Sequence, residues 1–261
     1  MKKILYFMLF TLLSALPVSA NADKMDPVLT GFYSTTNSTV ANQSFTSYAG
    51  ELGTVIAPKF LGPANTLGSY GFSASWEMSF THINAKNSYW QKGAKNPPEF
   101  AKTMQIHFEK GLPFSIQLGG IVTHVFQSGL WGLAMDAKWA VVEGFKYVPD
   151  ISIGGFVGTL LGGGDLAMLD AGMNILISKP FTLGGVVVIT PYAGYRFLYI
   201  NASSHLTITS QGNMFVLSRR NIYRHRALIG FTLSGTHIIT GLELSLSPSV
   251  QSYTMKFGLV F

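Results

Sequence analysis

Apolar side chains stand at every second position along most of this chain, from about residue 68 to the last residue. In residues 68–83, Phe72, Trp76 and Phe80 alternate with small polar residues and Glu77. Successive side chains of a β-strand point to opposite faces, so the pattern predicts strands with one apolar and one polar face. Nine further segments are predicted as strands, at about 101–110, 114–126, 130–142, 151–161, 167–178, 184–200, 224–234, 237–247 and 252–261; those at 151–161 and 224–234 alternate less regularly.

The composition limits what these strands can build. The chain is 48% hydrophobic and only 11% charged, whereas about 25% of the residues of a soluble domain are charged. A soluble β-sandwich would carry charges on its outer faces, but here the non-apolar faces are mostly Ser, Thr and Gly. No later run approaches the roughly 18 apolar residues of a membrane helix. We therefore expect an all-β fold over residues 68–261: a closed, antiparallel transmembrane β-barrel, which pairs every backbone polar group within lipid.

The N-terminus has the three parts of a secretory signal peptide. Lys2 and Lys3 are followed by an apolar stretch over residues 4–16 and by Ala20-Asn21-Ala22, whose small residues suit signal peptidase. The apolar stretch is too short for a membrane anchor, so we expect residues 1–22 to be removed. There is no cysteine, which excludes lipidation at cysteine and disulfides.

Residues 23–67 form a lead-in without strand periodicity. Apolar residues recur near helical spacing between Phe45 and Phe60, which predicts a short amphipathic helix, with Pro58 weakening its last turn. This helix would lie on the periplasmic side or plug the lumen. A two-stranded hairpin is the alternative, and it would raise the strand count from ten to twelve.

The lengths of the connections predict an orientation. Both ends of an even-stranded barrel face the periplasm, which places the tight connections near residues 111–113, 179–181 and 234–236 on that side. The two longest connections, 84–100 and 201–223, then lie outside. Short periplasmic turns and long outer loops are the expected asymmetry.

The last ten residues carry a specific pattern. An unbroken apolar face ends on the terminal phenylalanine, formed by Tyr253, Met255, Phe257, Leu259 and Phe261. This strand resembles the C-terminal signature of bacterial outer-membrane β-barrel proteins. The resemblance implies that Tyr253, Phe257, Leu259 and Phe261 act as an assembly signal read by the barrel-assembly machinery. It also implies residence in the outer membrane of a Gram-negative cell, in contact with its lipid and lipopolysaccharide.

The charged residues of the strands occupy the polar face and should point into the lumen. Because an unpaired buried charge is costly, we expect them to pair across the interior or to line a polar pore. Glu243 and Lys256 lie on neighbouring strands and are predicted to pair. The predicted lumen-facing charges are Glu77, Glu109, Asp136, Lys138, Asp170, Arg196, Arg226, Glu243 and Lys256.

A basic cluster follows the long connection that ends near residue 223. Arg219, Arg220 and Arg224 are predicted to lie outside, where guanidinium groups would bind lipopolysaccharide phosphates. The alternative is a solvated run of charges. The formal charge of +6 is too modest to suggest nucleic-acid binding.

Catalytic and cofactor motifs are weak. The six histidines show no close metal-ligand spacing, so we expect no metal and no other cofactor. His107 and Glu109 share an inward face, but polar packing explains them better than catalysis, and we do not expect an enzyme. Two functions remain: a passive, porin-like channel or transporter for small solutes, and a structural or surface-interaction barrel with a filled interior. Ten strands lie near the filled limit, since eight strands are just filled and about sixteen leave a channel.

Overall fold

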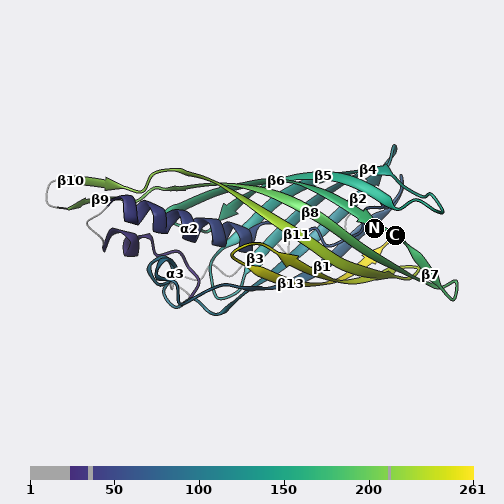
Figure 1. Ribbon diagram of the computed structural model, residues 1–261, viewed down its shortest axis with the longest axis horizontal. Helices are drawn as coiled ribbons and strands as arrows, with labels where there is room; N and C mark the ends of the chain where they lie inside the picture. Colours follow the sequence, from purple (N-terminus) through teal and green to yellow (C-terminus); the bar gives the residue numbers. More distant parts are fainter. Residues whose placement is uncertain (1–23, 35–37, 211–212) are drawn as a thin grey trace, which may run out of the picture.

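The computed structural model describes residues 24–34, 38–210 and 213–261. The predicted signal peptide and its cleavage site lie outside the described residues. Ten long antiparallel strands form a closed barrel, as predicted (Figure 1). They are β1 (Phe72–His82), β2 (Phe100–Leu112), β3 (Ile116–Val125), β4 (Trp131–Val142), β5 (Asp150–Leu161), β6 (Leu166–Ser178), β8 (Val187–Ser204), β11 (Arg220–Ser234), β12 (Ile238–Leu246) and β13 (Gln251–Val260).

The strands follow one another around the barrel in chain order, and β13 pairs with β1 to close it. Two short hairpins extend the ends. β7 (Phe181–Leu183) pairs with the start of β8, and β9 (Thr207–Ser210) pairs with β10 (Asn213–Val216). Figure 1 shows β7 and the C-terminus at one end of the barrel, and α3 with the β9–β10 hairpin at the other. The second end carries the long connections, and it is the end that the predicted orientation places outside.

One predicted boundary is wrong. Residues 201–223 were expected to form an outer loop, but β8 continues to Ser204 and β11 already begins at Arg220. The inward side chains of these extensions include the apolar, buried Ala202 and Ile222. These side chains pack on a helix instead of lining a polar lumen. The inner face is therefore apolar there, so a pattern that requires a polar inner face does not predict these strand ends.

The described residues include three helical segments: η1 (Leu29–Ser34), α2 (Ser38–Ile56) and α3 (Ser88–Gly93). The predicted N-terminal helix is confirmed, although α2 starts earlier than residue 45 and ends at Ile56. Its end fits Pro58, because the residue before a proline disfavours helical geometry. The alternative hairpin, and with it a twelve-stranded barrel, is wrong. No helix in the described part of the chain is long and apolar enough to cross a membrane.

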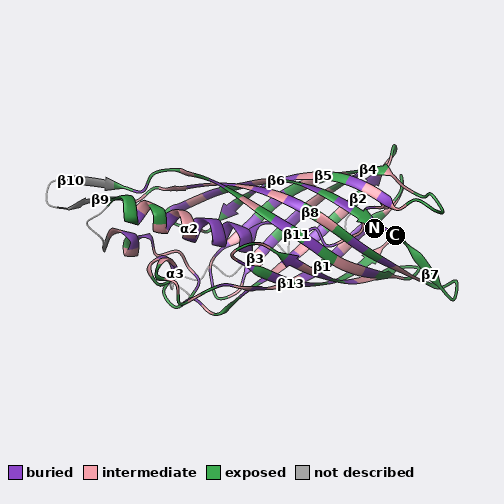
Figure 2. Ribbon diagram, viewed as in Figure 1, coloured by how far each residue is buried: buried purple, intermediate pink, exposed green. Residues whose placement is uncertain are grey.

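The apolar core lies inside the outer half of the barrel. Phe45, Leu52 and Val55 of α2 are fully buried and belong to one cluster with wall residues such as Ile121 and Ile200. Figure 2 shows α2 passing from an exposed outer turn into a buried inner portion, while the strands alternate between buried and exposed residues. The outward residues form an apolar surface that includes Trp76, Leu133, Met135, Met173, Ile175 and Phe257.

Candidate functional site

The lumen below α2 is occupied by the chain itself. Residues 57–67 run from the end of α2 through the barrel to the start of β1, and Ala57, Leu61 and Ala64 are buried along the way. This segment has no regular secondary structure within it. Its backbone groups therefore need partners from the barrel wall, because buried backbone groups are rarely left unpaired.

Cationic side chains of the wall supply donors to the carbonyl groups of this chain. Lys256 donates its Nζ–H to the Leu61 carbonyl at 2.8 Å, and Lys138 donates to those of Pro63 and Asn65 at 3.2 and 2.9 Å. Arg196 donates to the Pro58 carbonyl at 3.3 Å. In the last turn of α2, the Thr54 carbonyl accepts a hydrogen bond from Arg226. Four of the predicted lumen charges thus hold the N-terminal chain.

Neutral and acidic side chains of the wall accept hydrogen bonds from the backbone N–H groups of residues 57–67. Gln105 accepts from the Lys59 amide at 3.2 Å, Ser178 from Ala64 at 3.0 Å and Gln117 from Leu67 at 3.2 Å. At the periplasmic end, Glu143 accepts both the amide and the hydroxyl of Thr66. The segment is therefore bonded to the wall from one end to the other.

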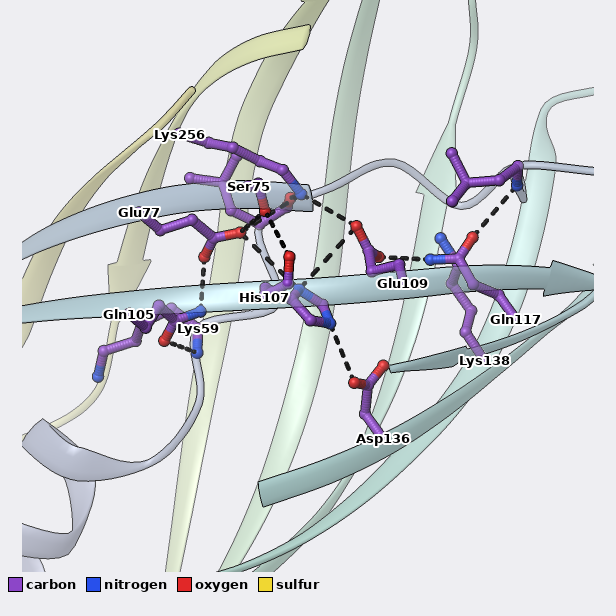
Figure 3. A network of polar contacts seen from close by, with 12 residues as sticks. Lys59, Ser75, Glu77, Gln105, His107, Glu109, Gln117, Asp136, Lys138 and Lys256 are labelled. Atoms are coloured by element: carbon purple, nitrogen blue, oxygen red, sulfur yellow. Dashed lines mark hydrogen bonds and ion pairs between the residues drawn. The ribbon is translucent and has the colours of Figure 1, made fainter. Parts of the chain in front are cut away.

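Five ionisable wall residues, Glu77, His107, Glu109, Asp136 and Lys256, form a compact polar network beside the segment (Figure 3). The Lys256 ammonium lies 3.3 Å from Glu77 and 3.4 Å from Glu109. His107 Nε2 lies 3.0 Å from Asp136. Glu77 is fully buried and also accepts a hydrogen bond of 2.6 Å from Gln105, so these carboxylates do not face an open water path.

The predicted pair between Glu243 and Lys256 does not form. Glu243 is opposite Thr254 in the register of β12 and β13, while Lys256 is opposite Glu77 across β1. Glu243 instead accepts a hydrogen bond from Tyr192 at 3.0 Å. Strand neighbours were predicted correctly, but a register shift of two residues exchanged the partner.

A second group of basic side chains lies in the lumen close to the end of α2. Arg196 and Arg226 are both buried and stand directly opposite each other on β8 and β11. Lys59 of the threading segment is buried as well, and its ammonium donates to the Thr54 carbonyl at 2.7 Å. Arg196 also lies over the Phe60 ring, 5.1 Å from its centroid. Like charges opposite each other in a sheet are unfavourable, so the carbonyl oxygens and the ring offset this repulsion.

The structure places all nine predicted lumen charges on inward positions, at or below intermediate exposure. Five are acidic and four are basic, and Lys59 is a fifth base that the sequence analysis missed. A signal for it exists, because Lys59 is the only Lys or Arg between Lys24 and Lys86. The five acids are Glu77, Glu109, Asp136, Asp170 and Glu243, and the four wall bases are Lys138, Arg196, Arg226 and Lys256.

Little space remains around the segment. One cavity of about 20 Å³ lies between Phe60, His107 and Asp136, and another of about 10 Å³ lies between Ile56, Pro58 and Asp170. A buried water needs at least about 10–15 Å³, so each holds at most one or two water molecules.

The outer end is closed by a cap that includes η1, α3 and the outer half of α2. Glu51 of α2 is buried and accepts hydrogen bonds from Trp90 at 2.6 Å and Tyr89 at 2.8 Å. The Tyr48 ring packs edge-on against Trp90, with centroids 5.0 Å apart. The sequence analysis missed Glu51, although it is the only charged residue of α2, which is a usable signal.

The predicted outer basic cluster is divided. Arg219 is exposed outside the strands, as expected, but Arg220 and Arg224 lie within β11 at inward positions. The Arg224 guanidinium lies so close to α2 that a Cβ on Gly50 would come within 2.5 Å of it. Arg224 therefore packs on the plug helix instead of facing lipopolysaccharide, because β11 starts earlier than predicted.

The residues of the predicted assembly signal lie on the closing strand. Tyr253, Phe257 and Leu259 are exposed on the outward face of β13, and Phe261 follows it. Phe261 exchanges two backbone hydrogen bonds of 2.8 Å with Phe72 at the start of β1. The terminal residue thus completes the seam between the first and last strands.

No group of three or more metal-binding side chains occurs in the described part of the chain. No protein-family model matches the sequence, and no curated protein sequence matches it significantly.

Several solved structures are similar in fold. The KdgM porin in complex with disordered oligogalacturonate matches with a TM-score of 0.36 and 8% identity, over 72% of this chain and 99% of that chain. Ail, the attachment invasion locus protein of Yersinia pestis, matches at 0.27 and 12%, over 74% and 99%. The COG4313 outer membrane channel from Pseudomonas putida F1 matches at 0.42 and 8%, over 78% and 100%. The barrel architecture itself follows from the strand pairing, in which ten strands lie in chain order and β13 closes on β1.

Proposed function

We propose that this protein is an outer-membrane barrel that its own N-terminal segment closes to solutes, and that it acts by presenting a folded cap at the cell surface. The observation that carries this proposal is the bonded passage of residues 57–67 through the lumen. Wall charges that could set the selectivity of a pore instead bind this segment or one another. The filled, surface-interaction barrel is thus favoured over the solute channel.

A solute channel would need a continuous water path. The cavities beside the segment, about 20 and 10 Å³, are too small for one. Transport would require residues 57–67 to leave the lumen and to give up their bonds to at least Gln105, Lys138 and Lys256. Such a movement would also expose the fully buried Glu77.

The cap is the part of the molecule that would meet a partner. Its backbone is joined to the outer loops, since Met25 donates to the Gln127 carbonyl at 2.9 Å and Val28 to the Gly93 carbonyl at 2.8 Å. Lys86 and Lys95 are exposed on it. A basic outer surface fits contact with lipopolysaccharide, and the function needs no catalytic group or cofactor.

Conductance tests the closed lumen. Purified wild-type protein in a planar bilayer should give no stepwise conductance. A variant that lacks residues 38–67 should give steps, because the remaining wall encloses the space vacated by α2 and the segment. Regular ion-conducting steps from the folded wild-type protein would contradict the proposal, whether or not the deletion variant folds.

Surface labelling tests the orientation. A membrane-impermeant amine reagent applied to intact cells should modify Lys86 and Lys95 of the cap. Lys146, equally exposed but at the opposite end of the barrel, should react only after the outer membrane is opened. Labelling of Lys146 on intact cells with protection of Lys95 would show that the cap faces the periplasm.

A further inference from the structure

Strand β2 marks both boundaries of the apolar belt. Its outward positions run from Lys102 through Met104, Ile106 and Phe108 to Lys110, and the two lysines are exposed. At about 3.4 Å per residue they stand roughly 27 Å apart along the strand. With a tilt of about 40° this is roughly 20 Å along the barrel axis, close to the height of a transmembrane apolar band. Lys102 therefore lies at the outer boundary and Lys110 at the periplasmic one.

The two lysines differ in their surroundings. Lys110 donates to the carbonyls of Tyr70 at 2.8 Å and Gly71 at 3.3 Å. The ammonium of Lys102 has no hydrogen-bond or ion-pair partner among residues 24–34, 38–210 and 213–261. At the outer boundary, the outer surface of the barrel therefore carries an ammonium group that has no partner among the described residues and lies among apolar side chains.

A pocket opens beside Lys102 on the outside of the barrel. It has a volume of about 330 Å³ and is lined by Met78, Pro98, Phe100, Lys102, Phe126 and Gln127. The walls come from neighbouring strands, since Lys102 stands opposite Phe80 of β1 and its carbonyl oxygen accepts a hydrogen bond of 2.9 Å from the Phe126 amide of the β3–β4 turn. The pocket combines apolar walls with one ammonium group.

We propose that this pocket binds lipopolysaccharide of the outer leaflet, with a lipid A phosphate on Lys102 and an acyl chain against Met78, which stands opposite Met104 on the membrane side of Lys102. The charge and the apolar walls match a molecule whose phosphates lie directly above its acyl chains. A charged hydrogen bond at a membrane boundary is stronger than one in water, because the site is partly desolvated. This assignment rests on the outer-membrane orientation given above, but not on whether the lumen is closed.

The test compares two lysines of one strand and one face. Binding of purified bisphosphorylated lipid A to the folded, detergent-solubilised protein should weaken roughly tenfold in Lys102→Ala. Lys110→Ala, at the other boundary, should bind as the wild type does. Equal affinity of Lys102→Ala and wild type, or an equal loss in Lys110→Ala, would overturn the proposal.

Two further probes separate the ligand chemistry. Lipid A stripped of both phosphates should bind wild type as weakly as intact lipid A binds Lys102→Ala. Met78→Trp, which fills the pocket from the β1 side, should weaken binding of intact lipid A. If phosphatidylglycerol binds as tightly as lipid A and depends equally on Lys102, the pocket takes any anionic phospholipid and the assignment to lipopolysaccharide is wrong. Conductance of the wild type would overturn the closed-lumen function and leave these binding results unchanged.

Discussion

At Lys256, one ammonium group links two wall carboxylates to the backbone of the threading segment. Its Nζ lies 3.3 Å from Glu77, 3.4 Å from Glu109 and 2.8 Å from the Leu61 carbonyl oxygen. The side chain is 3% exposed and that of Glu77 is fully buried. Removing one member of such a pair leaves a buried charge without compensation, which costs more than the pair itself contributes.

Lys256→Met should therefore lower the free energy of unfolding by roughly 3–5 kcal/mol. Urea unfolding of the purified protein, followed by heat-modifiable migration on gels, measures this change. Adding Glu77→Gln to Lys256→Met should recover part of the loss. Lys110→Met, whose side chain is exposed, is the control. A Lys256→Met variant as stable as that control would show that the pair contributes little.

Tyr89 gives the cap a dependence on alkaline pH. Burial, followed by its hydrogen bond to Glu51, raises the pKa of the Tyr89 hydroxyl from 10.0 to about 12. A raised pKa favours the neutral hydroxyl in the folded cap, so its contribution is complete below pH 10 and is lost as the pH rises through about 12. Cap opening, measured by the fluorescence of Trp90, which is buried in the cap, should increase over this range. Tyr89→Phe should lack this step, and an unchanged pH profile in Tyr89→Phe would exclude Tyr89 as its cause.

At the scale of elements, α2 and η1 approach their neighbours closely through glycines. A Cβ on Gly31 of η1 would lie 2.2 Å from the Lys92 carbonyl oxygen at the end of α3, and a Cβ on Gly53 of α2 would lie 2.8 Å from Ile200. The second contact involves the end of a flexible side chain. The first involves backbone, which cannot move without separating η1 from α3.

Gly31→Val should loosen the cap while the barrel stays intact. We expect faster trypsin cleavage within residues 83–99 and unchanged heat-modifiable migration of the barrel. Gly62→Val is a suitable control, because nothing lies within 4 Å of a Cβ at that position. Equal cleavage rates in the two variants would show that the contact between η1 and α3 does not hold the loop.

At the scale of the whole molecule, the barrel depends on the seam between its first and last strands. β13 pairs with β1 over ten residue pairs, from Ser73–Val260 to His82–Gln251. Phe261 adds two further backbone hydrogen bonds with Phe72. An unclosed seam would leave backbone groups unpaired in lipid, where each costs several kcal/mol.

Deleting Phe261 should therefore impair assembly into the outer membrane, both because the seam is shortened and because the predicted assembly signal is lost. The measurement is the fraction of heat-modifiable protein in outer-membrane preparations. Cleavage of the signal peptide should be unaffected, which separates an assembly defect from an export defect. If the variant without Phe261 gave normal amounts of folded protein, neither the hydrogen bonds between Phe261 and Phe72 nor the predicted assembly signal at Phe261 would be needed for assembly.

The sequence by itself determined the barrel. Alternation in segments such as 69–83 and 252–261 sets which side chains face lipid, and a closed sheet is the only way to pair backbone groups in a membrane without helices. The same alternation placed the nine charges on inward positions, because the face of a strand residue depends only on its parity along the strand.

Only the tertiary structure decided what fills the barrel. Residues 57–67 have no periodicity because they form no regular element, and their backbone groups find partners on several strands, among them Gln105 of β2, Lys138 of β4 and Lys256 of β13. Pairing of charges depended on register, which brought Lys256 to Glu77 rather than to Glu243. The outer strand ends were missed because their inward residues Ala202 and Ile222 are apolar and belong to one core cluster with α2, so the inner face is not polar there. Contacts between residues far apart in sequence cannot be read from local periodicity, and here they determine whether the lumen is open.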